Sequence, residues 1–232
     1  MELFDNLIFT NTNLGFFADK NDILIKNIFG DLNDFKISDG DIKINLENGM
    51  KIQSNFKSAI DLNKDLLKNY TKFISKNEFI SSLNYLKADL NNSLNITLDK
   101  TYKVEKFSYN ILGDVKNGKF VLKNSFKNNF LKKEIKDIYF SDFQLDMNFS
   151  QDIMKFKGEG QYSFDNLNFF KINLDNKKIK DKLNLFLNLD FGENFQLDLI
   201  NYKKTNKNIA ALSLNLEKSK DEIKINKLYF SE

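Results

Sequence analysis

The feature that most constrains this chain is a two-residue alternation of apolar and polar side chains. It is clearest in the segment LNLFLNLDF, where apolar residues occupy every second position: Leu183, Leu185, Leu187, Leu189 and Phe191. Successive side chains of a β-strand point to opposite faces of a sheet, so these residues would share one face. The pattern therefore predicts a strand with one apolar side, and it leaves open what that side contacts.

The residues that follow this strand predict a hairpin. Gly192-Glu193-Asn194 is typical of a turn, and the apolar alternation then resumes at Phe195, Leu197 and Leu199. We expect residues 183–202 to form one hairpin whose apolar side chains lie on a single face.

The same alternation recurs along most of the chain. The segments that carry it are residues 41–56, 94–98, 107–126, 142–164, 170–174 and 209–230. The pairs Asn48-Gly49 and Asn117-Gly118 predict tight hairpin turns, because such turns need residues that adopt positive φ. The sequence predicts a mainly β fold, with antiparallel strands in successive meanders over most of 20–62 and 90–230.

One segment has helical spacing instead. Its apolar residues recur at intervals of three and four: Leu66, Leu67, Tyr70, Phe73 and Ile74. Asn63 is a suitable N-cap, and Asp65 would favour the positive end of the helix dipole. The spacing predicts one inserted α-helix near 64–76, lying across a sheet, and leaves open one or two helical turns near Phe79–Leu86.

The composition excludes most catalytic chemistry. The chain contains neither Cys nor His, which removes the usual zinc, haem and iron–sulfur ligands and the common nucleophile–base pairs. The Asp-rich residues 31–41 lack the spacing of a calcium loop and predict a turn. Gly158-Glu159-Gly160 lacks the third glycine of a dinucleotide fingerprint and predicts a bulge or a close strand approach. We expect no enzymatic activity, no cofactor and no metal.

The charge balance bears on nucleic-acid binding. The 35 basic residues, all of them Lys, nearly cancel the 32 acidic residues, which leaves a formal net charge of +3. A dedicated polyanion binder would carry a clustered excess of positive charge. The sequence therefore predicts no nucleic-acid partner.

The pattern alone permits three readings of the apolar side. In a sandwich or barrel, apolar faces bury one another and the core is closed. In an open curved sheet, the apolar face would line a groove for acyl chains. An enzyme or another kind of binding module is the third reading, and no motif supports it.

Three stretches of the sequence resemble the AsmA-like family of Gram-negative envelope proteins, which includes AsmA, TamB and YhdP. They are NKDLLKNYTKFISK, LKADLNNSLNITLDKTYKVEKFSYNILGDVKNGKFVLK and SDFQLDMNFSQDIMKFKGEGQYSF. The shared features are short strands with one apolar and one polar face, and two sequence patterns. These patterns are GDVKNGKF at 113–120 and FKGEGQY at 156–162. The resemblance extends from about Leu24 to the last residue.

The resemblance implies a long curved sheet bent into a taco-like β-groove, here one elongated domain over 1–232. Members of the family are anchored in the inner membrane by an N-terminal helix, cross the periplasm and are implicated in moving phospholipid to the outer membrane. This sequence has no run of about 18 apolar residues and no signal peptide. We therefore expect an internal or C-terminal part of a longer periplasmic protein, whose other parts would reach the two membranes.

The implied function is a non-enzymatic lipid conduit whose partners are phospholipid acyl chains. The alternative is a structural or assembly β-sandwich domain of the cell envelope with a closed core. The candidate lipid-groove residues are Ile42, Ile44, Leu46, Leu94, Ile96, Leu145, Met147, Leu185, Leu187, Leu189, Leu197, Leu199, Leu212 and Leu214. Such a conduit needs no reaction, since an apolar surface avoids a cost of about 0.8 kcal/mol for each CH₂ exposed to water.

Overall fold

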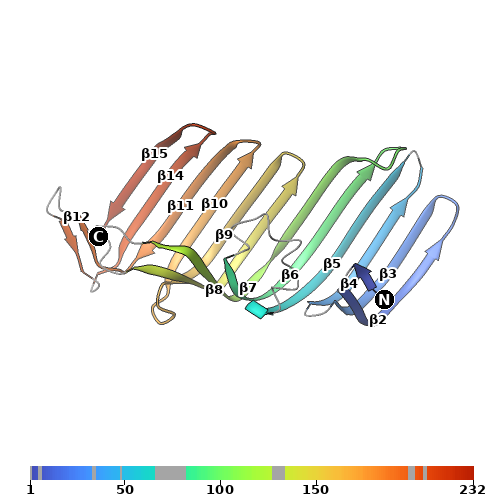
Figure 1. The fold of residues 1–232 in the computed structure, drawn as a ribbon, viewed down its shortest axis with the longest axis horizontal. Helices are drawn as coiled ribbons and strands as arrows, with labels where there is room; N and C mark the ends of the chain where they lie inside the picture. The colour runs from blue at the N-terminus through green and yellow to red at the C-terminus, as the bar shows by residue number, and fades with distance from the viewer. Residues whose placement is uncertain are drawn as a thin grey trace.

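The computed structural model describes residues 2–4, 7–32, 35–47, 49–65, 82–126, 134–197, 202–205 and 208–232. Figure 1 shows a single broad sheet whose strands follow one another in chain order. Thirteen strands form this sheet, in the order β1 to β11, then β14 and β15, and each strand is antiparallel to its neighbours. The sheet is open, because β1 and β15 are both edge strands. The prediction of a mainly β fold built from antiparallel meanders is confirmed.

The strands vary from short edge pieces to one of 23 residues. In chain order they are β1 (Glu2–Phe4), β2 (Leu7–Ala18), β3 (Asp22–Leu32), β4 (Phe35–Asn45), β5 (Met50–Asn63), β6 (Leu83–Leu98), β7 (Val104–Phe126), β8 (Ile135–Ser150), β9 (Ile153–Ser163), β10 (Phe170–Ile179), β11 (Lys182–Phe191), β12 (Phe195–Leu197), β13 (Tyr202–Lys204), β14 (Ala210–Lys218) and β15 (Ile223–Ser231). β12 and β13 form a separate two-stranded sheet between β11 and β14.

The register assigns every strand residue to one of two faces. Residues directly opposite each other on neighbouring strands share a face, as Leu174, Leu187 and Leu214 do. We call the face that carries Leu187 the apolar face and the face that carries Asn188 the polar face. One row of the apolar face runs in register from β3 to β15: Gly30, Ile37, Ser58, Leu90, Gly113, Leu145, Gly158, Leu174, Leu187, Leu214 and Leu228.

Bulges keep the apolar residues on the same face where the alternation slips. Asn27, Asp39 and Asp142 have positive φ and lie at register shifts. Each shift inserts extra residues, so that Phe140 and Phe143, three positions apart, pair with residues of the same face. Asn and Asp tolerate positive φ better than other non-glycine residues, which is why they stand at these positions.

The core lies on the apolar face. Ala88, Val115 and Phe143, on three neighbouring strands, form its centre, and Ile60 and Leu62 form a second cluster on β5. The Phe143 ring lies over Gly158, where a Cβ atom would collide with it, and the β8 backbone at Asp142 and Phe143 also approaches Gly160 closely. The close strand approach predicted for Gly158-Glu159-Gly160 is confirmed.

Most of the described strands belong to one continuous sheet. Every substantial contact between strands joins neighbours in the same sheet, so side chains pack laterally and most remain half-buried. The chain of 27.2 kDa has an accessible surface of 15647 Å². A compact monomer of this mass would expose about 10,900 Å². An excess of accessible surface is expected when the strands form one broad sheet.

Two predicted turns have different outcomes. Gly49 has a φ of 111° in the connection between β4 and β5, so the turn predicted at Asn48-Gly49 is confirmed from its described residue. The turn predicted at Asn117-Gly118 is wrong, because β7 continues through both residues. A register shift occurs there instead, opposite Lys87 and Ala88.

The hairpin predicted over residues 183–202 is also wrong. β11 pairs with β14, and β12 pairs with β13 instead of folding back on β11. The alternation identified the apolar side of β11 correctly, but alternation does not specify which strand lies alongside.

The predicted helix is largely untested by the structure. Only Lys64 and Asp65 of the range 64–76 are described with helical backbone, and the remainder lies outside the described residues. The helical turns considered near Phe79–Leu86 are wrong at Leu83–Leu86, which belong to β6.

Candidate functional site

The apolar face is the candidate functional surface, and it carries most of the residues predicted for lipid contact. The predicted residues on it are Ile42, Ile44, Leu94, Ile96, Leu145, Met147, Leu185, Leu187, Leu189, Leu212 and Leu214. All of them are half-buried by their neighbours in the sheet. They come from β4, β6, β8, β11 and β14, so the structure joins distant segments into one surface.

Three predicted residues lie elsewhere. Leu46 follows the end of β4 and is exposed. Leu197 belongs to β12 in the small two-stranded sheet, and Leu199 lies outside the described residues.

A polar cluster interrupts the apolar face across β5, β6 and β7. Asn92, 5% exposed, donates from Nδ2 to Ser58 Oγ at 3.0 Å and accepts at Oδ1 from the Tyr109 hydroxyl at 2.8 Å. Ser54 and Ser58 are also buried, at 8% and 7% exposure. Burial raises the pKa of Tyr109, so its hydroxyl stays protonated as a donor.

Sequence reasoning missed this cluster. The signal was present, because Ser54, Ser58 and Asn92 stand at positions where the alternation expects apolar residues. The β5 segment reads Ile52, Ser54, Phe56, Ser58 on one face, which is apolar and polar in turn.

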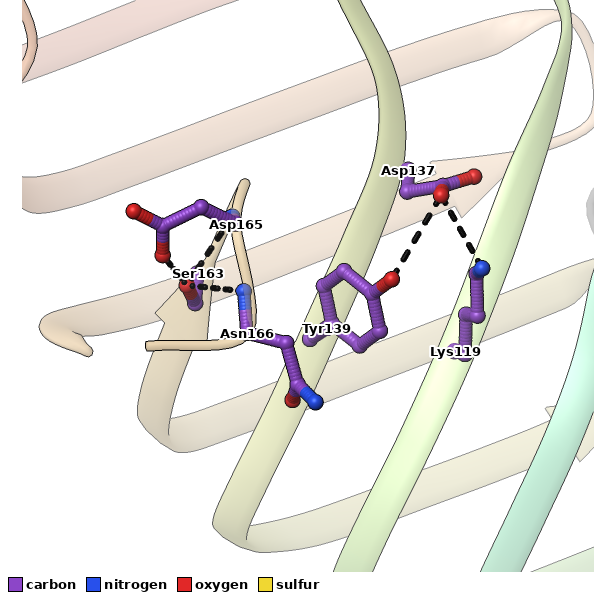
Figure 2. A network of polar contacts seen from close by, with 6 residues as sticks. All are labelled: Lys119, Asp137, Tyr139, Ser163, Asp165 and Asn166. Atoms are coloured by element: carbon purple, nitrogen blue, oxygen red, sulfur yellow. Dashed lines mark hydrogen bonds and ion pairs between the residues drawn. The ribbon is translucent and has the colours of Figure 1, made fainter. Parts of the chain in front are cut away.

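The polar face carries ion pairs between neighbouring strands. Lys57 Nζ lies 2.7 Å from Asp39 Oδ2, and Lys157 Nζ lies 3.5 Å from Asp175 Oδ2. Figure 2 shows a further set, in which Asp137 accepts from Lys119 at 2.9 Å and from the Tyr139 hydroxyl at 3.4 Å. The hydrogen bond to Asp137 raises the pKa of Lys119.

The polar face also has shallow hollows. One of about 650 Å³ is lined by side chains that include Gln144, Glu159, Asn173 and Asn188. A smaller one, of about 260 Å³, is lined by Asn55, Lys57, Asn91 and Ser93 among others. Both hollows are also lined by apolar residues, among them Leu112 in the smaller one and Leu189 in the larger one.

A buried lysine closes the β12–β13 insertion. Lys204, 1% exposed, donates from Nζ to the carbonyl oxygens of Glu193, Thr205 and Asn208 at 3.2, 3.1 and 2.6 Å. Its ammonium also lies 5.8 Å from the centre of the Phe191 ring. Burial lowers the pKa of Lys204. Because all three donors of the ammonium are used, this arrangement is a structural lock on the chain between β11 and β14.

The β9–β10 connection is fixed by one carboxylate. Asp165 Oδ1 accepts from the backbone N–H groups of Asn168 and Leu167, each at 2.9 Å. The Ser163 hydroxyl lies 2.9 Å from the same oxygen and accepts from the N–H groups of Asp165 and Asn166, the latter two contacts drawn in Figure 2. The hydrogen bonds, that from Asn168 first, hold the pKa of Asp165 well below its ordinary value.

No metal-binding cluster occurs among the described residues. The ranges given above contain no group of three or more Asp and Glu side chains arranged to hold an ion. In the part of the chain that the structure describes, no helix is long and apolar enough to span a membrane.

Comparisons with known proteins identify no relative. No protein-family model matches the sequence, and neither the curated proteins nor the solved structures gave a significant match.

Proposed function

We propose that this chain is a non-enzymatic lipid-binding module whose apolar face carries phospholipid acyl chains. The observation that supports the proposal is the row of register-matched residues from β3 to β15, most of which are apolar. Acyl chains on this face would avoid the cost of about 0.8 kcal/mol for each CH₂ that water would otherwise contact.

The cellular setting of the proposal comes from the AsmA-like resemblance. By that resemblance, the module would act in the periplasm of a Gram-negative envelope. In that setting the sheet would carry lipid between the inner and outer membranes.

A structural or assembly role is the second candidate, and the β15 edge supports it. Ile223, Ile225 and Leu228 lie on this edge strand, which pairs with β14, and more than half of each side chain is exposed. Exposed apolar edge strands accept further strands from other chains or segments. In that case strand addition at β15, and not lipid contact, would be the main activity.

Two neighbouring residues of β11 test the lipid proposal. Leu187→Asp places a carboxylate on the apolar face, and Asn188→Asp places the same group on the polar face. With a phospholipid that carries a photoreactive acyl chain, we expect Leu187→Asp to reduce labelling at least severalfold and Asn188→Asp to leave it unchanged.

The melting temperature of each variant separates loss of binding from loss of fold. Leu187 is half-buried on an open sheet, so its new carboxylate can hydrate and the variant should stay folded. Unchanged labelling of a folded Leu187→Asp protein would contradict the lipid proposal. Collapse of the fold would indicate a closed environment at Leu187 and favour the structural role.

A further inference from the structure

The polar cluster of Ser54, Ser58, Asn92 and Tyr109 lies within a surface that is otherwise apolar. Its strands β5, β6 and β7 are central in the sheet, and its neighbours in register include Ile42, Leu90 and Leu94. Buried polar groups in an apolar setting are normally paired, and each exception calls for a physical explanation.

Two hydroxyl donors of this cluster have no acceptor in the described part of the chain. Ser58 Oγ accepts from Asn92, which leaves the Ser58 O–H unused. The Ser54 hydroxyl has no hydrogen-bond partner among the described residues, although Ser54 is only 8% exposed. Leaving such a donor unpaired is unfavourable, so the two hydroxyls suit a ligand that brings hydrogen-bond acceptors.

Asn92 and Tyr109 position the Ser58 hydroxyl. The Tyr109 O–H donates to Asn92 Oδ1 and thereby fixes which side of the amide carries the NH₂ group. That NH₂ group occupies a lone pair of Ser58 Oγ, so the Ser58 proton is directed to a different partner.

The chemistry of the patch selects one kind of acceptor. A hydrocarbon chain offers none. A phosphate would need cations, and Lys57, next to Ser58 in β5, belongs to the opposite face and pairs with Asp39. An ester carbonyl is neutral, accepts hydrogen bonds, donates none and is attached to an acyl chain that the flanking Ile42 and Leu94 would contact.

We propose that Ser54 and Ser58 donate hydrogen bonds to the ester carbonyls of glycerophospholipids lying on the apolar face. This inference rests on the proposed function and specifies the lipid class for that surface. The two serines are four residues apart on an extended strand, about 13 Å, so they are two separate carbonyl-binding positions on either side of Phe56.

The test compares ester-linked and ether-linked phosphatidylcholine with identical chain lengths, since the ether lipid lacks both carbonyls. Wild-type protein should retain the ester lipid about three- to tenfold better in a competition measured by mass spectrometry, the range expected for one or two hydrogen bonds. The Ser54→Ala/Ser58→Ala double variant should bind both lipids equally. Ser93→Ala on the polar face of β6 is the matched control and should keep the preference.

The outcomes separate this inference from the function on which it rests. Equal binding of both lipids by folded wild-type protein overturns the ester positions and leaves the lipid-binding module intact. A preference that persists in the double variant assigns the carbonyl contact to other residues and also overturns the inference. Binding of neither lipid overturns the proposed function itself. Ser54→Ala should not lower the melting temperature, whereas Ser58→Ala also removes the acceptor of Asn92 Nδ2 and should lower it modestly.

Discussion

The two faces of this sheet are built by the same strands and differ in what holds them together. On the apolar face, Phe143 packs against Phe140 and Phe156, with ring centroids 5.3 and 6.4 Å apart. On the polar face, the cross-strand contacts are ion pairs such as Lys57–Asp39, with both side chains more than half exposed. Desolvated apolar contacts stabilise far more than exposed ion pairs do. The comparison indicates that lateral packing on one face supplies most of the folding free energy of the described sheet.

The largest effect should come from Phe143→Ala. Phe143 is 6% exposed and its ring covers Gly158, so truncation removes packing and leaves a cavity. Substitutions of this type cost about 3–5 kcal/mol of unfolding free energy. Chemical denaturation would measure the loss. The adjacent Gln144→Ala, on the polar face, should change stability by no more than about 0.5 kcal/mol, and equal losses in the two variants would refute the assignment of faces.

Lys204 is an exception to this division, because it is a charged residue that is buried. Its substitution should cause the second-largest loss of stability. Lys204→Met keeps much of the side-chain volume but leaves three carbonyl oxygens without their donor. We expect a loss of about 1–3 kcal/mol, the cost of unsatisfied buried groups. Hydrogen exchange should show it as faster opening of β12 and β13. Lys203→Met, at an exposed position, is the control, and similar exchange in both variants would contradict the structural lock.

The sequence predicted the faces of the sheet better than its strand pairing. Ile42, Leu94 and Leu187 reached the predicted face because alternation is local and records which side is buried. The partner of β11 was missed because it depends on the insertion that separates residues 191 and 210, which alternation does not describe. The pair Asn117-Gly118 was misread because the residues that permit a turn also permit a bulge within a long strand.

The candidate site was predictable in outline, but its polar cluster was not. Apolar positions along β8, β11 and β14 identified the surface because lipid contact and core packing require the same residue types. Ser58 and Asn92 form a specific hydrogen bond across strands, which can be anticipated only once the register of β5 and β6 is known. A single polar residue within an alternating segment carries no such information.

A smaller effect on stability, which depends on pH, is expected at Asp165. The negative charge of its carboxylate is stabilised mainly by backbone N–H groups. Its folded-state pKa is lowered, chiefly by the Asn168 N–H, so the stabilisation is complete above the ordinary pKa of 3.8. Below that pH the unfolded chain takes up a proton while the folded carboxylate resists it, and the stabilisation is lost as pH falls. Asp165→Ala should cost about 1 kcal/mol at pH 7, a value reduced for solvent exposure.

Measuring the unfolding free energy of wild type and Asp165→Ala at pH 7 and pH 3 would test this. The difference between the two proteins should shrink at pH 3. A difference that is constant with pH would show that the carboxylate charge is not what orders the β9–β10 connection.

The smallest effect should be the coupling between Lys57 and Asp39, and it sharpens the comparison of the faces most directly. The two atoms lie 2.7 Å apart, yet the side chains are 60% and 54% exposed, so water and salt screen the attraction. A double-mutant cycle with Lys57→Ala and Asp39→Ala should give a coupling of about 0.2–1 kcal/mol at low salt and less at high salt. The matched cycle on the apolar face uses Leu187→Ala and Leu214→Ala, which are directly opposite each other in register. Its coupling should be unaffected by salt, because the contact is apolar. If the ionic pair proved stronger than the leucine pair, or the leucine pair weakened in salt, the polar face would contribute more to folding than the burial of the two faces indicates.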